Sequence, residues 1–170
     1  MNGAFDMSEG FRMKGKFQSS VSIVIQAPAS KIWEIADDIS LIPSYHPEVG
    51  KVDLIDGKSK RVSGVKYQCS VLEGRRGSCI EEVVEYIPQR KISTAMSQDT
   101  WGIDKMLADF IVDSIVRPID EHSCSIQFDA YYNPFGFRKK VLNILVLRRA
   151  FKKRSPSVMQ GIKHLAETGK

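Results

Sequence analysis

The segment spanning residues 22–54 constrains the fold more than any other part of the chain. Alternating apolar residues up to Ile25 predict a strand, and Pro28 ends it because proline has no N–H for a sheet ladder. Ser30 is the expected N-cap of a short helix, in which apolar residues recur at helical spacing as far as Ile39. The chain therefore begins with a strand that turns directly into a short amphipathic helix.

A second short helix is expected at 40–44, interrupted at Pro43, and a second strand follows at 49–55. Clean alternation with polar turns predicts further hairpin strands at 65–72, 79–87, 91–96, 106–119 and 123–130. Strands joined by such short turns must be antiparallel neighbours. From Gly136 to Thr168 the period becomes helical, with a kink or a break expected at Pro156. The predicted class is α+β, with seven strands, two short helices after the first strand, and one long C-terminal helix.

Three stretches, APASKIWEIADDI, IPSYHPEV and VMQGIKHLAETG, carry a family resemblance. In this order the chain resembles the START-like (SRPBCC) superfamily, which includes the birch-pollen-allergen fold and the polyketide cyclase/dehydrase and lipid transport group. The resemblance covers roughly residues 16–169. It implies a helix-grip fold, in which a curved antiparallel sheet wraps around the C-terminal helix and leaves a ligand cavity. We expect one such domain at 16–170, preceded by a mobile tail at 1–15.

The composition is that of an ordinary globular protein, with 42% hydrophobic and 26% charged residues. No signal peptide is indicated at the N-terminus, and no apolar run approaches the ~20 residues that span a bilayer. A cytoplasmic location is therefore expected. The three cysteines lack the spacing of a zinc site, so neither a metal nor a cofactor is predicted.

No motif typical of a nucleophile, a zinc protease or a dinucleotide site is present, so no catalytic residue is assigned. The predicted ligand contacts are the apolar or polar positions of the inward sheet face, one loop tryptophan and two residues of the last helix. They are Tyr67, Cys69, Glu82, Trp101, Phe110, Val112, Ile126, Phe128, Val141 and Leu145.

Glu82 is the expected polar group of this cavity, placed beside Tyr67 and Cys69 by hairpin pairing. A slip of one residue in that pairing would turn it outward, and the alternation alone leaves both registers open. The role of His46 is also undecided by the sequence. It is either an acid or base at the cavity mouth, or a half-buried residue that holds its loop.

The last helix is strongly basic, with eight lysines and arginines from Arg138 to Arg154 and no acid among them. One interpretation is a core helix with a solvated basic back. The other is transient contact with an anionic membrane while the apolar side faces the cavity. Nucleic acid is disfavoured, because aromatic residues are not interleaved with the basic ones.

Three functions remain open from the sequence. The favoured one is binding, with possible transport, of a hydrophobic small molecule such as a lipid, a quinone or a polyketide-like compound. The second is an enzyme similar to the polyketide aromatase/cyclases, which would need several polar groups converging in the cavity. The third is an interaction module that holds a partner's segment in an apolar groove.

Overall fold

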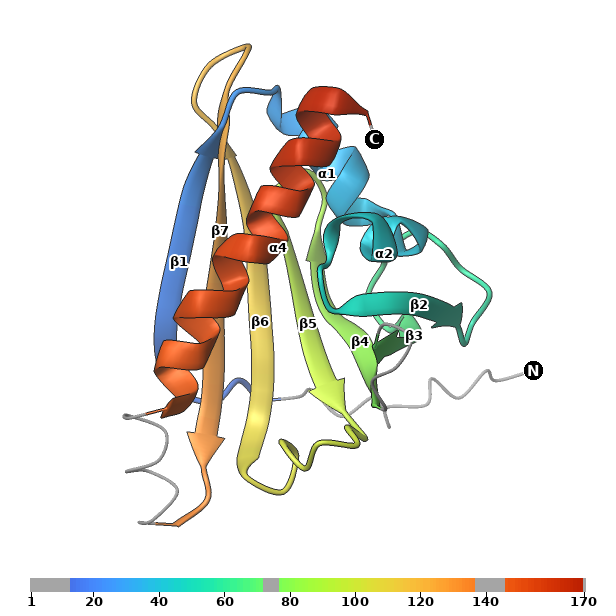
Figure 1. The fold of residues 1–170 in the computed structure, drawn as a ribbon, viewed down its shortest axis with the longest axis vertical. Helices are drawn as coiled ribbons and strands as arrows, with labels where there is room; N and C mark the ends of the chain where they lie inside the picture. The colour runs from blue at the N-terminus through green and yellow to red at the C-terminus, as the bar shows by residue number, and fades with distance from the viewer. Residues whose placement is uncertain (1–12, 72–76, 137–145, 170) are drawn as a thin grey trace, which may run out of the picture.

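The computed structural model describes residues 13–71, 77–136 and 146–169. Its core is one sheet of seven strands in the order β1-β7-β6-β5-β4-β3-β2, with every neighbouring pair antiparallel (Figure 1). The strands are β1 (Phe17–Ile25), β2 (Val49–Leu54), β3 (Lys66–Val71), β4 (Ser78–Ile87), β5 (Lys91–Ser97), β6 (Leu107–Pro118) and β7 (Cys124–Pro134). The predicted hairpin order is confirmed, and β1 forms one edge of the sheet, where it pairs with β7.

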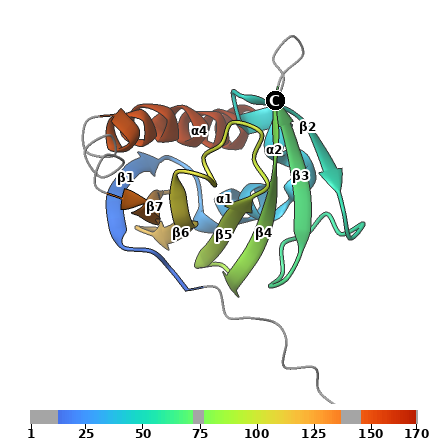
Figure 2. The ribbon, with the colours of Figure 1, turned by 90° about the horizontal axis from the view of Figure 1, so that it is seen from below.

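The sheet is strongly curved and encloses the helices on its concave side (Figure 2). Helix α4 (Arg148–Thr168) crosses the concave face, α2 (Ile42–Tyr45) lies beside β2, and α1 (Ala29–Asp37) packs against α4 and β6 (Figures 1 and 2). The architecture is therefore the helix-grip arrangement expected for this α+β chain.

The two short helices follow β1 as predicted, but the start of α1 and the place of Pro43 in α2 differ from the prediction. Helix α1 begins at Ala29 with Pro28 as its N-cap, and no side chain caps it, so the expected role of Ser30 is wrong. The carbonyl of Pro28 accepts hydrogen bonds from the backbone N–H groups of Lys31 and Ile32, so the helix starts two residues earlier than predicted. Pro43 does not interrupt α2 but lies in its first turn, where the missing N–H costs nothing.

Helix α4 runs unbroken through Pro156, so of the kink or break expected there, the break is wrong. A proline inside a helix removes one backbone hydrogen bond and costs about 3 kcal/mol. Here Ser155, Met159, Ile162 and Ala166 are buried on one stripe that spans the proline, and this packing offsets the cost. Most of the segment before α4, residues 137–145, lies outside the described residues.

Gly161 allows α4 to pass directly over the end of α2. A Cβ atom at this position would lie against the carbonyl oxygen of Tyr45, and 2.8 Å from its carbonyl carbon. Only a glycine permits such a close approach of two backbones. Because Tyr45 and His46 stand at this crossing, α4 determines where both residues lie.

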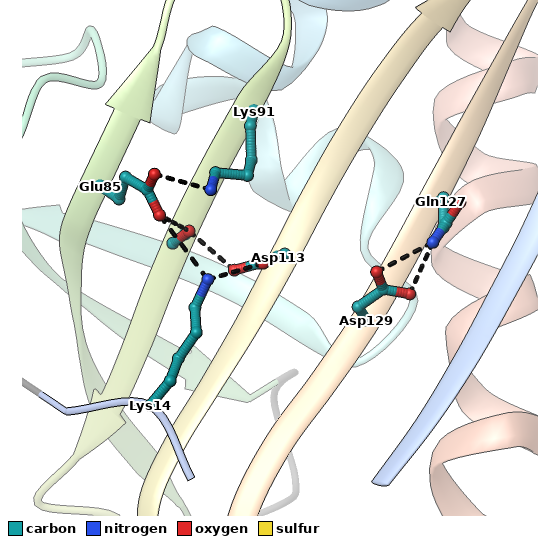
Figure 3. A network of polar contacts seen from close by, with 7 residues as sticks. Lys14, Glu85, Lys91, Asp113, Gln127 and Asp129 are labelled. Atoms are coloured by element: carbon teal, nitrogen blue, oxygen red, sulfur yellow. Dashed lines mark hydrogen bonds and ion pairs between the residues drawn. The ribbon is translucent and has the colours of Figure 1, made fainter. Parts of the chain in front are cut away.

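The convex face carries a buried polar network that binds the N-terminal segment (Figure 3). The ammonium group of Lys14 lies 2.7 Å from a carboxylate oxygen of Asp113 and 3.6 Å from one of Glu85. The hydroxyl of Ser93 donates to Asp113 at 2.7 Å, and Lys91 pairs with Glu85 at 2.6 Å. Lys14, within the expected mobile tail, therefore neutralises a carboxylate that is 4% exposed.

Candidate functional site

The predicted ligand contacts from the sheet share the concave face that packs against the helices. Tyr67, Cys69, Ile126 and Phe128 are buried in the main core, together with residues of α1 and α4, and Val112 packs against them. Phe110 belongs to a smaller cluster at the other end of the face, where its ring stacks on Tyr132 with centroids 5.6 Å apart. That these side chains touch a ligand stays a prediction.

The carboxylate on this face is Glu81, and the expected position of Glu82 is wrong by one residue. Tyr67 is paired across the hairpin with Glu81, and its hydroxyl donates a 2.7 Å hydrogen bond to the Glu81 carboxylate. Glu82 is paired with Lys66 on the opposite face, where their charged groups are 3.9 Å apart. The period of two in a strand turns this one-residue shift into a change of face.

A buried arginine, Arg61, stands at the centre of the polar cluster on the concave face. It is 6% exposed, although it comes from the loop between β2 and β3. Its guanidinium donates to the carbonyl oxygen of Ala36 at the end of α1 and, at 3.1 Å, to the Tyr67 hydroxyl. Arg61, Tyr67 and Glu81 therefore form one hydrogen-bonded chain from cation to carboxylate.

Burial keeps the tyrosines of this cluster neutral. It raises the pKa of Tyr67 well above its usual value, although the Arg61 charge acts in the opposite direction. The pKa of Tyr45, which interacts with the same guanidinium, is also raised by burial. Both phenols therefore act as neutral hydrogen-bonding groups, and neither serves as a base at physiological pH.

His46 is neutral as well, because burial lowers its pKa. Its Nδ1 atom accepts a 3.2 Å hydrogen bond from the backbone N–H of Glu48, so the geometry assigns the proton to Nε2. The charge of Glu81 acts against this lowering, which indicates that His46 lies within electrostatic reach of the cluster. His46 thus holds its loop, as one of the two interpretations has it, and presents an N–H donor.

The cysteines near this cluster are not nucleophiles. Cys69 and Cys79 face one another across β3 and β4, and both are free thiols. Burial raises the pKa of Cys79 to about 12 and that of Cys69 further still, so both remain protonated at neutral pH. Within the described parts of the chain, no group of three acidic, histidine or cysteine residues could hold a metal ion.

A pocket of about 440 Å³ opens where β5 and β6 diverge. The pairing of these strands ends at Ala95 and Ile111, next to an irregularity in β6 where Asp109 has a φ of 56°. The pocket is lined by residues of both strands, of the connecting loop and of the N-terminal segment, among them Met13, Met96, Ile103, Leu107 and Phe110. It therefore lies next to Phe110 and to the N-terminal segment, and its lining does not include Arg61, Tyr67 or Glu81.

The remaining predicted contacts lie elsewhere or cannot be placed. Trp101 is 45% exposed, its indole ring lies against Gly77 just before β4, and it is not among the residues that line the pocket. Val141 and Leu145 fall outside the described residues. Arg61 was not predicted, because a single arginine in the polar loop DGKSKRVSG carries no periodicity that would indicate burial.

Solved structures with the same fold are numerous and distant in sequence. Norcoclaurine synthase from Thalictrum flavum, in complex with dopamine and hydroxybenzaldehyde, aligns over 89% of this chain and 87% of its own, with a TM-score of 0.69 and 16% identity. The di-domain ARO/CYC protein BexL aligns over 88% of this chain and 46% of its own (TM-score 0.70, 17% identity). Ara h 8.0201 aligns over 88% and 97% (TM-score 0.67, 13% identity). At these identities the likeness establishes the fold alone.

Sequence comparison identifies the family directly. The curated proteins gave no significant match. No described helix is long and apolar enough to cross a membrane. The family model described as Polyketide cyclase / dehydrase and lipid transport matches residues 16–167, nearly the whole chain. This chain therefore belongs to the polyketide cyclase/dehydrase and lipid transport family.

Proposed function

We propose that this protein binds a hydrophobic small molecule on the concave face of its sheet, between the sheet and α4, and carries it. The observation that supports this most is the Arg61–Tyr67–Glu81 chain, which lies among the buried apolar side chains of the main core. Ligand sites are mostly apolar, with a few placed polar groups that orient the bound molecule. The family to which the chain belongs is itself described by cyclase, dehydrase and lipid transport activities.

An aromatase/cyclase-like reaction is the alternative. The Tyr67 hydroxyl between a cation and a carboxylate is the arrangement that favours it, since it could orient a carbonyl group. Against this, burial raises the pKa of the tyrosines and of the Cys69 thiol, so these groups stay protonated and supply no anionic nucleophile or base. A carrier needs only orienting groups, so binding without turnover is the function we favour. Native mass spectrometry of the protein purified from its own host would identify the ligand, and recovery with no bound small molecule would count against a carrier.

Two phenylalanines of the concave face, Phe110 and Phe128, provide a direct test of apolar binding. We expect Phe110→Trp and Phe128→Trp to raise the Kd of the uncharged dye Nile red by about fivefold or more, which corresponds to roughly 1 kcal/mol of lost affinity. The larger ring would occupy the space that the dye needs. Fluorescence titration measures this, with Ile119→Trp as the control, since Ile119 is 56% exposed in the turn between β6 and β7. Unchanged affinity in both variants would place the dye elsewhere.

We further propose that α4 brings the protein to anionic membranes. Arg149, Lys152 and Lys153 are exposed on its outer side. The two sheet carboxylates that might have neutralised this helix are engaged elsewhere, Asp109 with Asn133 and Asp113 with Lys14. Each basic group near an anionic surface contributes about 1 kcal/mol, and the attraction decays within a Debye length.

Co-sedimentation with vesicles tests this contact. We expect binding to vesicles that contain phosphatidylserine but not to neutral vesicles, with a steep loss between low and physiological salt. The triple variant Arg149→Glu, Lys152→Glu, Lys153→Glu should abolish it. A triple variant with the same change in net charge, at the exposed Lys31, Lys58 and Arg90, is the control. If both triple variants lose vesicle binding equally, the binding depends on net charge alone and not on α4, which contradicts the proposal. Equal pelleting of the wild-type protein with neutral and anionic vesicles would also overturn it.

A further inference from the structure

The buried cation of Arg61 is only partly satisfied by the protein itself. The guanidinium donates to a backbone carbonyl and to the Tyr67 hydroxyl and also interacts with the Tyr45 hydroxyl, whereas its Nε atom is buried without any hydrogen-bond partner. Buried donors are rarely left unpaired, because each one costs about 1–3 kcal/mol. Arg61 thus retains a free donor on the concave face, at the place where the apolar ligand is proposed to bind.

The charge of Arg61 is also without a direct counter-ion. Among the described residues no ion pair joins it to a carboxylate, and Glu81 reaches it only through the Tyr67 hydroxyl. The convex face is different, since the buried carboxylate of Asp113 there has an ammonium group at 2.7 Å. A buried charge is costly unless it is paired and hydrogen-bonded. The arrangement therefore favours an additional anionic oxygen near Arg61.

Two neutral hydroxyl groups, those of Tyr67 and Tyr45, lie at the guanidinium. Tyr45 interacts with the guanidinium, and His46, next in the chain, is within electrostatic reach of Glu81. Arginine is the side chain best suited to carboxylate recognition, because its fork of N–H donors matches the two oxygens. A cation with neutral donors around it favours an acid over the corresponding ester or alcohol.

We propose that the ligand is an apolar molecule with a single carboxylate, and that Arg61 binds this group. This inference rests on the proposed function, since it names the chemical class of the molecule held on the concave face. The polar end of the ligand then lies beneath α1 and α2, and its apolar body extends along the sheet towards Phe110. Arg61 would serve as a specificity-determining residue rather than as a catalytic one.

A matched pair of probes separates this inference from simple apolar binding. Dansylaminoundecanoic acid and its methyl ester share the same apolar body and the same fluorophore, and differ in the carboxylate. We expect the wild-type protein to bind the acid at least about tenfold more tightly than the ester at neutral pH, as one charge-assisted contact provides. Arg61→Met should remove this preference, because it raises the Kd of the acid at least about tenfold more than it raises that of the ester. Arg90→Met, at an exposed turn, is the control and should keep the preference.

Each outcome decides between the two proposals. Equal affinity of the wild-type protein for acid and ester would overturn the carboxylate inference and leave apolar binding intact. Binding of neither probe would overturn both. An acid preference that survives in Arg61→Met would mean that Arg61 only holds α1 against the sheet. If Arg61→Met does not fold, Arg61→Lys is the test, because lysine retains the positive charge but lacks the planar set of guanidinium N–H donors. A reduced preference for the acid in Arg61→Lys supports the inference, and an unchanged preference contradicts it.

Discussion

Replacing Gly161 by alanine is expected to destabilise the protein by about 2 kcal/mol, the opposite of its usual effect in a helix. In a helix interior, alanine is normally about 1 kcal/mol more favourable than glycine. Here the added Cβ would lie 2.8 Å from the Tyr45 carbonyl carbon and closer still to its oxygen. Overpacking of this kind costs typically 1–3 kcal/mol, and a backbone neighbour yields less readily than a side chain. The clash therefore outweighs the gain in helix propensity.

Urea unfolding measures this effect, with Gln160→Ala as the control at the adjacent exposed position of α4. The control should change the free energy of unfolding by no more than about 0.5 kcal/mol. Gly161→Val should be worse than alanine, since it adds bulk at the same crossing. An alanine variant as stable as the wild type would mean that α4 and α2 do not approach each other this closely. Because Tyr45 and His46 stand at this crossing, Gly161→Ala should also weaken binding of the acid probe.

Replacing Asp99 by alanine is expected to lower the free energy of unfolding by about 2–4 kcal/mol and the melting temperature by about 5–15 °C. Asp99 is 8% exposed, and its carboxylate accepts hydrogen bonds from three backbone N–H groups of the loop after β5. The donors are Trp101 and Ile103, both at 2.9 Å, and Asp104 at 2.7 Å. Hydrogen bonds to a charged acceptor contribute about 1.5–3 kcal/mol each, and less where the donors regain water. Asp99 therefore holds the loop whose residues border the pocket between β5 and β6.

The effect of Asp99 should depend on pH. Burial tends to raise the pKa of Asp99, but the backbone hydrogen bonds outweigh it, so the pKa lies below the usual 3.8. A depressed folded-state pKa gives stability that is fully present above the unfolded value and lost as the pH falls through the folded value. The difference between wild type and Asp99→Ala should therefore be constant near neutrality and shrink below pH 3.8.

Thermal unfolding across this pH range tests the prediction. Asp120→Ala is the matched control, because Asp120 also accepts a backbone hydrogen bond, at 2.8 Å from His122, but is exposed in a turn. It should cost about 1 kcal/mol or less. A loss as large as that of Asp99→Ala would show that burial of the acceptor is unimportant. A difference that persists unchanged below pH 3 would assign the loss to packing rather than to the carboxylate.

The alternation of side chains along the chain is enough to determine the sheet. Apolar residues at every second position in β3, β6 and β7, with short polar turns between strands, leave antiparallel hairpins as the practical solution. The same alternation assigns Tyr67, Cys69, Ile126 and Phe128 to one face, where the structure has them buried together. The change to a helical period after the last strand likewise predicts α4. These are local signals, and local periodicity is what a single sequence records best.

Only the tertiary structure decided three features on which the site depends. The register of β3 against β4 placed Glu81 rather than Glu82 beside Tyr67, because one residue of slip reverses a face and periodicity cannot distinguish the two pairings. Packing on both sides of Pro156 kept α4 continuous against its local cost. Arg61 became buried because α1 and β3 close over its loop from opposite sides, and the carbonyl of Ala36 and the hydroxyl of Tyr67 replace its water. Those partners lie 25 residues before it and 6 residues after it, and no pattern within the loop itself indicates either of them.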